Sequence, residues 1–169
     1  FSDVSVSDLD ILFRQYVSDP LEAQVLGGQY VQLVLRAVET LATNNMFLAW
    51  DVRLVSNDGT TVQGTLVTLR RAPLEVATSL DARTERMPIA TIAVASGDRL
   101  VFTIGTGGAP VAVHDSSLRI GDAASTDLVG EDGETADNNP WLELQQPLLF
   151  QAAVGAIRPN TLMLMGMGR

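Results

Sequence analysis

Three adjacent residues, His114, Asp115 and Ser116, carry the side chains whose types could support nucleophilic catalysis. A histidine, an acid and a serine form a catalytic triad only when they converge in space from separate elements. Three consecutive residues of an extended segment point in alternating directions instead. No G-x-S-x-G motif presents a serine elsewhere in the sequence. We therefore interpret His114 as a loop or edge histidine and assign no catalytic role to this group.

The rest of the chain offers little other catalytic equipment. It has no cysteine, no lysine and one histidine, so thiolate and amine chemistry is unavailable. Glu143, Asp51 and Glu75 are acids of the kind that glycosidases pair across a cleft, but the sequence gives no reason to pair them. The sequence favours a binding or structural role, and we predict that the protein is not an enzyme.

Two loop features could bind a ligand. An acidic stretch between residues 115 and 137 could hold Ca²⁺ through carboxylate oxygens, but its spacing matches no EF-hand. We expect a solvated loop and no cofactor, with calcium as the less favoured alternative. Asn138, Asn139 and Trp141 form a candidate ligand-facing loop, in which Trp141 either stacks on a sugar or caps the core.

The charge balance restricts the partners. The net charge is −9 at pH 7, and Arg70 and Arg71 form the only adjacent basic pair. Nucleic acids and anionic membranes are bound by clustered basic residues, so we expect neither as a partner. No apolar run approaches the roughly 20 residues that a membrane-spanning helix needs.

Alternating hydrophobicity predicts the fold. Residues 29–38 and 46–56 alternate with a period of two, which is typical of half-buried strands. The turn Asn57-Asp58-Gly59 joins the second of them to a return strand at 61–69, and Asp-Gly is a strong hairpin signal. A second hairpin is expected from 89–95 and 99–106. Strands without crossover helices indicate an all-β, antiparallel β-sandwich or jelly roll.

The two ends of the chain are predicted to be arms. We divide the sequence into an N-terminal arm at 1–10, a β-sandwich domain at 11–154 and a C-terminal extension at 155–169. The extension contains an apolar run, which either forms a final edge strand of the same sandwich or lies on a neighbouring protomer. Its candidate assembly contacts are Leu162, Met163, Leu164, Met165 and Met167.

Several segments together resemble one protein family. They are ILFRQYVSDPL at 11–21, VRLVSNDGTTVQGTL at 52–66, TSLDAR at 78–83, SGDRLV at 96–101, LRIGDAASTDL at 118–128 and NNPWLE at 138–143. In this order they are similar to small β-sandwich virion structural proteins of tailed bacteriophages. Members of that family have more sequence before the first segment and tend to end soon after the last. The residues following Leu149 are therefore a departure from the family pattern.

The resemblance implies a virion protein, either a capsid decoration or a tail-associated component, with no catalytic residues to transfer. Its expected partners are other virion proteins and further copies of itself, since symmetric assembly covers apolar edges; a trimer is one such assembly. The alternative is a glycan-binding β-sandwich module of a tail fibre or a secreted protein.

Overall fold

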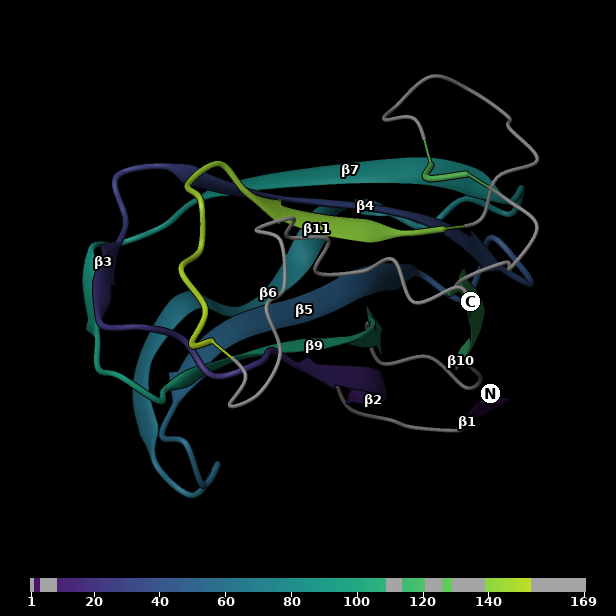
Figure 1. Cartoon of the computed structure of the whole chain (residues 1–169). Coiled ribbons are helices and arrows are strands. Elements are labelled where there is room, and N and C mark those ends of the chain that lie inside the picture. Colours follow the sequence, from purple (N-terminus) through teal and green to yellow (C-terminus); the bar gives the residue numbers. More distant parts are fainter. Residues whose placement is uncertain (1, 4–8, 109–113, 121–125, 129–138, 153–169) are drawn as a thin grey trace.

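The structure, a computed structural model, is built entirely from strands and loops in the part described, which comprises residues 2–3, 9–108, 114–120, 126–128 and 139–152 (Figure 1). The predicted all-β, antiparallel sandwich is confirmed, whereas its jelly-roll connectivity stays a prediction. The strands are β1 (Ser2–Asp3), β2 (Leu9–Val17), β3 (Gln24–Leu26), β4 (Tyr30–Glu39), β5 (Met46–Val55), β6 (Val62–Glu75), β7 (Asp81–Pro88), β8 (Ile92–Val94), β9 (Arg99–Gly108), β10 (His114–Arg119) and β11 (Trp141–Leu144).

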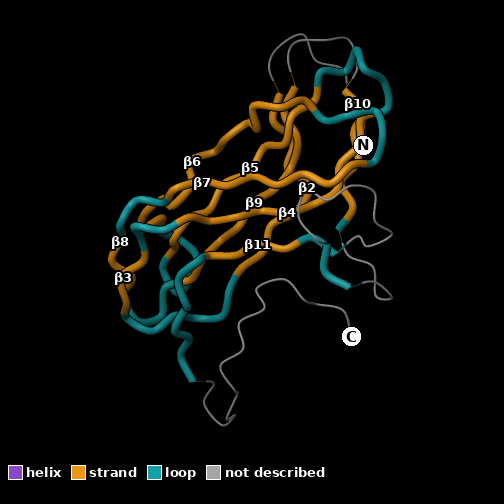
Figure 2. Tube along the Cα trace, turned by 90° about the horizontal axis from the view of Figure 1, so that it is seen from above, coloured by secondary structure: helices purple, strands orange, loops and turns teal. Residues whose placement is uncertain are grey.

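Two antiparallel sheets form the layers of the sandwich. One has the order β2-β9-β5-β6. The other is centred on β4, which pairs with β7 along one edge and with β10 and β11 along the other edge. A short β3–β8 pair lies at one end of the sandwich, and β1 extends the second sheet beyond β10 at the other (Figure 2). The edge strands β6 and β7 therefore lie on one side of the sandwich, and β2 and β11 on the other.

The core lies between the two sheets and is filled by alternate residues of β4, β5 and β9. Trp50 and Phe102 are its largest side chains, and their rings meet edge to face with centroids 6.4 Å apart. Tyr16 stacks on the same Phe102 ring at 6.0 Å. Burial of such apolar surface is the main force that stabilises a fold of this kind. The period-two pattern of the sequence thus places one face of each central strand inward.

The predicted hairpin at residues 46–69 is confirmed. β5 pairs with β6, and Gly59 adopts a φ of 73° in the turn between them. One Asp58 carboxylate oxygen accepts hydrogen bonds from both the Ser56 and Thr60 hydroxyls and from the Thr60 backbone N–H. These donors lower the pKa of Asp58, the Ser56 hydroxyl most. The side chains therefore stabilise the turn that the Asp-Gly pair predicted.

The second predicted hairpin is wrong in its pairing. The turn between Ala95 and Asp98 is present, and the Ala95 N–H donates to the Asp98 carboxylate at 2.9 Å. However, β8 pairs with β3, and β9 pairs with β2 and β5. Adjacent strands joined by a short turn usually pair with each other. Here the turn instead connects β8, which belongs to the short β3–β8 pair, to β9, which lies between β2 and β5 in the first sheet.

Three other local features were not predicted from the sequence. β3 lies just before the Gly27-Gly28 pair, and β6 continues beyond residue 69 as far as Glu75. Four register shifts between β5 and β6 accommodate this long strand. β7 was not predicted, because its sequence DARTERMP is largely polar, and an edge strand needs few apolar residues.

Gly27 and Gly28 offer a test of the chain path between β3 and β4. Both have positive φ angles, 142° and 71°. A side chain at Gly27 would collide with the backbone of Thr91, whereas the space beside Gly28 is open. We expect Gly28→Ala to cost only backbone strain of about 1 kcal/mol, and Gly27→Ala to cost distinctly more. Chemical denaturation of both variants measures the difference, and equal losses would contradict the close approach.

Candidate interaction surfaces and the polar end of the core

A buried polar group lies at the end of β4. The Glu39 side chain points into the core and is 2% exposed, and one of its carboxylate oxygens accepts a hydrogen bond from the Met46 N–H at 3.1 Å. Burial is the main cause that raises the pKa of Glu39. The hydrogen bond from the Met46 N–H lowers this pKa, whereas the negative charge of the nearby Glu75 carboxylate raises it further. One Glu75 oxygen is buried without a hydrogen-bond partner. Two acids thus share a poorly solvated corner of the core.

Two hydroxyl groups lie at the same end. Ser116 lies opposite Glu39 in the β10–β4 pairing, and its hydroxyl shares a 3.0 Å hydrogen bond with that of Thr106. Both residues are buried, Thr106 completely. The Ser116 hydroxyl is therefore hydrogen-bonded to another side chain of the core, that of Thr106. His114 is the first residue of β10, where it pairs with Asp3 of β1, and its side chain lies outside the described residues.

Trp141 packs against the outer face of the β4 sheet. It contacts a small apolar cluster formed by Val34, Ala82 and Leu128. Its indole N–H donates to the Leu128 carbonyl at 2.7 Å. Tryptophan needs such a partner when it is buried. Asn139 forms a parallel bridge with Asp127 nearby, and Asn138 lies outside the described residues.

The acidic stretch lies mostly outside the described residues, as do all five candidate assembly contacts of the C-terminal run. Among the residues that the structure places, no group of three or more histidine, cysteine or acidic side chains could hold a metal ion. The calcium alternative and the assembly contacts both stay predictions.

The first exposed surface is the open side where β6 and β7 face each other. A shallow groove of about 450 Å³ runs between them, with Leu66 and Val67 at its base. Leu69 and Pro88 on its walls are exposed, and Leu69 is 51% exposed. In the described part of the chain β6 pairs only with β5, so its other edge offers backbone groups to a partner strand. Sequence analysis missed this surface because the second wall is the polar strand β7.

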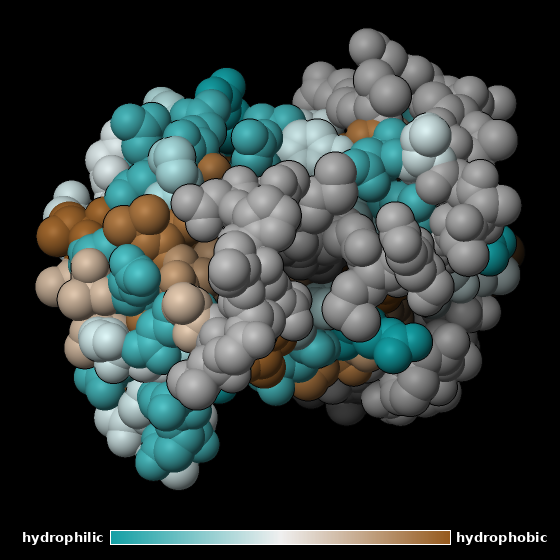
Figure 3. All heavy atoms as spheres, viewed as in Figure 1, coloured by the Kyte–Doolittle hydropathy of each residue, from teal (hydrophilic) through white to brown (hydrophobic). Residues whose placement is uncertain are grey.

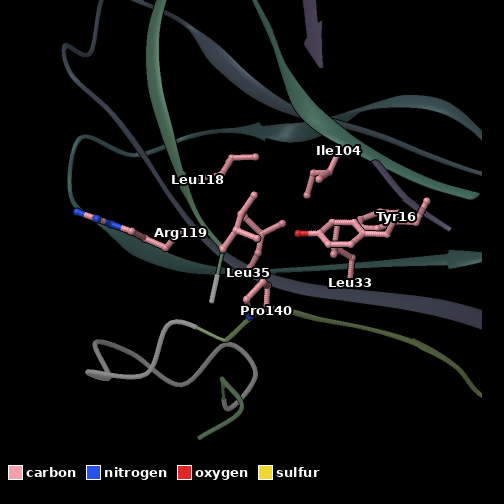
Figure 4. Close-up of a pocket in the computed structure, with 9 residues that line it drawn as sticks. Tyr16, Leu33, Leu35, Ile104, Leu118, Arg119 and Pro140 are labelled. Carbon is pink, nitrogen blue, oxygen red and sulfur yellow. The ribbon is translucent and has the colours of Figure 1, made fainter. Parts of the chain in front are cut away.

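The second surface is a narrow apolar slot on the opposite side (Figure 4). It opens between β2 and the point where β10 ends and β11 begins along β4. Tyr16 and Ile104 line one wall, and Leu33, Leu35 and Leu118 line the other. β10 and β11 together leave Leu35 without a strand partner on that edge, but the Leu35 side chain is only 1% exposed. Sequence patterns alone do not reveal a break of this kind between two strands.

Two glutamine side chains attach the segment after β11 to the β3 end of the sandwich. The Gln24 amide both donates to the Leu149 carbonyl and accepts from the Leu149 N–H, at 2.7 and 3.1 Å. Gln146 donates to the Val25 carbonyl and accepts from the Gly27 N–H. Val25 and Leu149 themselves are exposed there, and apolar side chains colour this end of the molecule brown in Figure 3. The chain therefore reaches its last described residues along a fixed path.

The chain matches no family model and no curated protein. No helix in the described ranges is long and apolar enough to cross a membrane.

Proposed function

We propose that the protein is a structural component of a bacteriophage virion, either a capsid decoration or a tail-associated protein, which acts through protein–protein contacts. The observation that carries the proposal is the β6–β7 side of the sandwich. A long edge strand with exposed Val62 and Leu69 borders a groove with an apolar base. Free edges of this kind bind other chains by strand addition or by apolar contact.

The chemistry of the interior supports the same role. The buried polar side chains Glu39, Thr106 and Ser116 are hydrogen-bonded within the core, Glu39 to the Met46 N–H and the two hydroxyls to each other. They hold one end of the sheets together. A virion component needs a rigid scaffold and contact surfaces, and the two packed sheets and the open β6–β7 side supply both.

The glycan-binding alternative receives less support from the site residues. An indole that stacks on a sugar must present a free ring face, whereas Trp141 packs on Val34 and Leu128. Its N–H is also engaged with a backbone carbonyl. Tyr30 is 43% exposed, but the Arg86 guanidinium lies over its ring at 4.6 Å. These contacts suit structural aromatics better than a sugar platform.

The oligomeric state tests the proposal. Light scattering coupled to size exclusion should give a closed oligomer, such as a trimer. Leu69→Arg should shift it towards monomer, because a charge would be buried in the contact. Leu149→Arg, at a similarly exposed leucine on the β3 end, is the matched control and should leave the oligomer intact. A protein that stays monomeric at every concentration, and that binds a sugar in a glycan screen, would overturn the proposal.

A further inference from the structure

The edge of β7 that faces away from β4 carries backbone groups whose directions follow from the pairing on its other edge. Just after β7, the Ile89 N–H donates to the Gln29 carbonyl at 3.0 Å, so Ile89 faces β4. Successive residues of a strand face opposite edges, and the β4–β7 register is unbroken. Ala82, Thr84 and Arg86 therefore direct their N–H and C=O groups away from β4. Within the described residues, β7 pairs with no other strand.

Two further observations agree with these directions. Pro88, which has no N–H, belongs to the set that faces away from β4, and proline occurs on edge strands with that side unpaired. On the opposite edge of β4, the Gln145 N–H donates to the Tyr30 carbonyl at 3.2 Å. Tyr30 therefore faces β11, and the preceding Gln29 faces β7. Thr84 thus lies in the middle of the free backbone groups that β7 offers.

Charged side chains alternate with these positions on the inner face of β7. Arg83 lies opposite Leu35 and Glu85 opposite Leu33, two leucines of the core. The Arg83 guanidinium reaches across the open side and donates to the carbonyl of Glu75, the last residue of β6, at 2.6 Å. Inward-pointing charges on an edge strand usually prevent the addition of another strand. A strand that supplies the opposite charge at each position is the exception, because it leaves no charge unpaired.

We propose that β7 pairs in antiparallel fashion with β7 of a second copy of the chain, about a two-fold axis beside Thr84. In this register Arg83 lies opposite Glu85 of the second copy, and Glu85 lies opposite Arg83 of the second copy. Opposite charges in such cross-strand pairs attract each other. Thr84 lies opposite its own counterpart and Ala82 opposite Arg86, with their free backbone groups directed at each other. The inference rests on the proposed function, because it names the partner that the open β6–β7 side would bind.

The neighbouring registers fit less well. With the axis at Arg83, this arginine would face its own counterpart and Glu85 would face Asp81, so like charges would be opposed. With the axis at Glu85, two glutamates would meet. An axis at Ala82 would pair Asp81 with Arg83, but the ladder would then extend beyond Asp81, where β7 begins. The axis at Thr84 combines opposite charges with a ladder that is contained in β7.

The symmetry of this contact favours a second copy over an unrelated strand. A two-fold contact uses the same surface on both copies, so each favourable pair occurs twice. β6 lies on the same side of the sandwich as β7 (Figure 2), and the rotation turns the β6 edges of the two copies towards each other. The closed dimer also leaves neither β7 edge open to uncontrolled strand addition.

Charge reversal followed by mixing tests the register. Arg83→Glu would oppose acids across the axis twice, and Glu85→Arg would oppose arginines twice. Each variant alone should therefore dimerise at least about tenfold more weakly than the parent. An equal mixture of the two should restore a heterodimer, because every pair then joins opposite charges. Sedimentation equilibrium measures the dissociation constants, and a mixture that associates no better than the single variants would overturn the proposal.

A backbone variant covers the case in which a charge reversal close to Glu75 does not fold. Thr84→Pro removes the N–H at the axis, which faces away from β4, so the β4–β7 ladder keeps its hydrogen bonds. It should weaken the dimer at least about tenfold as well. Thr84→Ala, which keeps this N–H, is the matched control and should dimerise like the parent. Circular dichroism checks that both variants are folded, and a folded Thr84→Pro variant with the parental dissociation constant would contradict the pairing.

The outcomes separate this inference from the proposed function. The parent should be a dimer or a closed assembly of dimers. A trimer, or an oligomer that Leu69→Arg dissociates but the β7 variants leave intact, would overturn the β7 pairing and leave the virion role standing. A dimer that mixing restores, formed by a protein that binds a sugar in a glycan screen, would support the pairing and count against the virion role. A parent that is monomeric at every concentration would overturn the pairing.

Discussion

Trp50→Ala is expected to cause the largest loss of stability of any single substitution considered for this protein. Trp50 is completely buried in the centre of β5 and packs against Phe102. Replacement of a buried tryptophan by alanine leaves a cavity and costs about 3–5 kcal/mol. Single domains have a total stability of about 5–15 kcal/mol, so much of the margin would be lost. Urea denaturation monitored by far-ultraviolet circular dichroism measures the change.

Trp50→Phe is the matched control for this cavity. The Trp50 indole N–H is buried without a hydrogen-bond partner, and an unsatisfied donor of this kind costs about 1–3 kcal/mol. Phenylalanine removes that donor but keeps much of the apolar volume. We therefore expect a loss well below that of Trp50→Ala. If the two variants lost equal stability, the tryptophan would contribute something other than volume to the core.

Glu39→Gln is expected to stabilise the protein at neutral pH, by roughly 0.5–2 kcal/mol, which is the usual size of a stabilising substitution. The substitution removes a buried charge next to Glu75 and keeps a side-chain oxygen that can accept the Met46 N–H. The new amide also offers hydrogens where one Glu75 oxygen has no partner. Thermal unfolding at pH 7 measures the gain. The comparison variant is Glu39→Ala, which removes the charge but also the acceptor of the Met46 N–H hydrogen bond. It should therefore gain less stability than Glu39→Gln.

The same substitution should flatten the dependence of stability on pH. The pKa of Glu39 is higher in the folded state than its ordinary value of 4.5, chiefly because the side chain is buried. The folded state therefore binds the proton more tightly, and the contribution of Glu39 to stability falls as the pH rises from 4.5 through the folded pKa. Glu39→Gln should remove this fall. A variant whose stability still falls over that range to the same extent as the parent would contradict the assignment to Glu39.

The sequence predicts the fold wherever its signals are local. The period-two patterns of β4 and β5 and the Asp58-Gly59 turn need only neighbouring residues, and all three are confirmed. The pairing of β9 with β2 and of β8 with β3 depends on residues far apart in the chain. The pattern of each strand shows which face is buried but not which strand lies beside it.

The candidate surfaces were less predictable than the fold for a related reason. A groove between two edge strands becomes visible only when the topology brings β6 and β7 to the same side. Glu39 was missed because an acid at the end of an apolar strand looks like the beginning of a loop. Trp141 was recognised as a residue of interest, yet its role depends on Leu128, whose position relative to β11 no local pattern encodes.

The position of β11 has a consequence for how the protein is made. β4 pairs with β11 through partners such as Leu33 and Leu142, which are separated by most of the chain. Folds dominated by such distant pairings form in milliseconds to seconds, whereas helical bundles form much faster. During synthesis on the ribosome, the part of β4 that pairs with β11 stays unpaired until Leu144 has been added to the chain. At typical rates of translation this takes several seconds. The β5–β6 hairpin joins strands that are close in sequence and can form during this time. β9 can then pair with the free edge of β5 as soon as it has been synthesised.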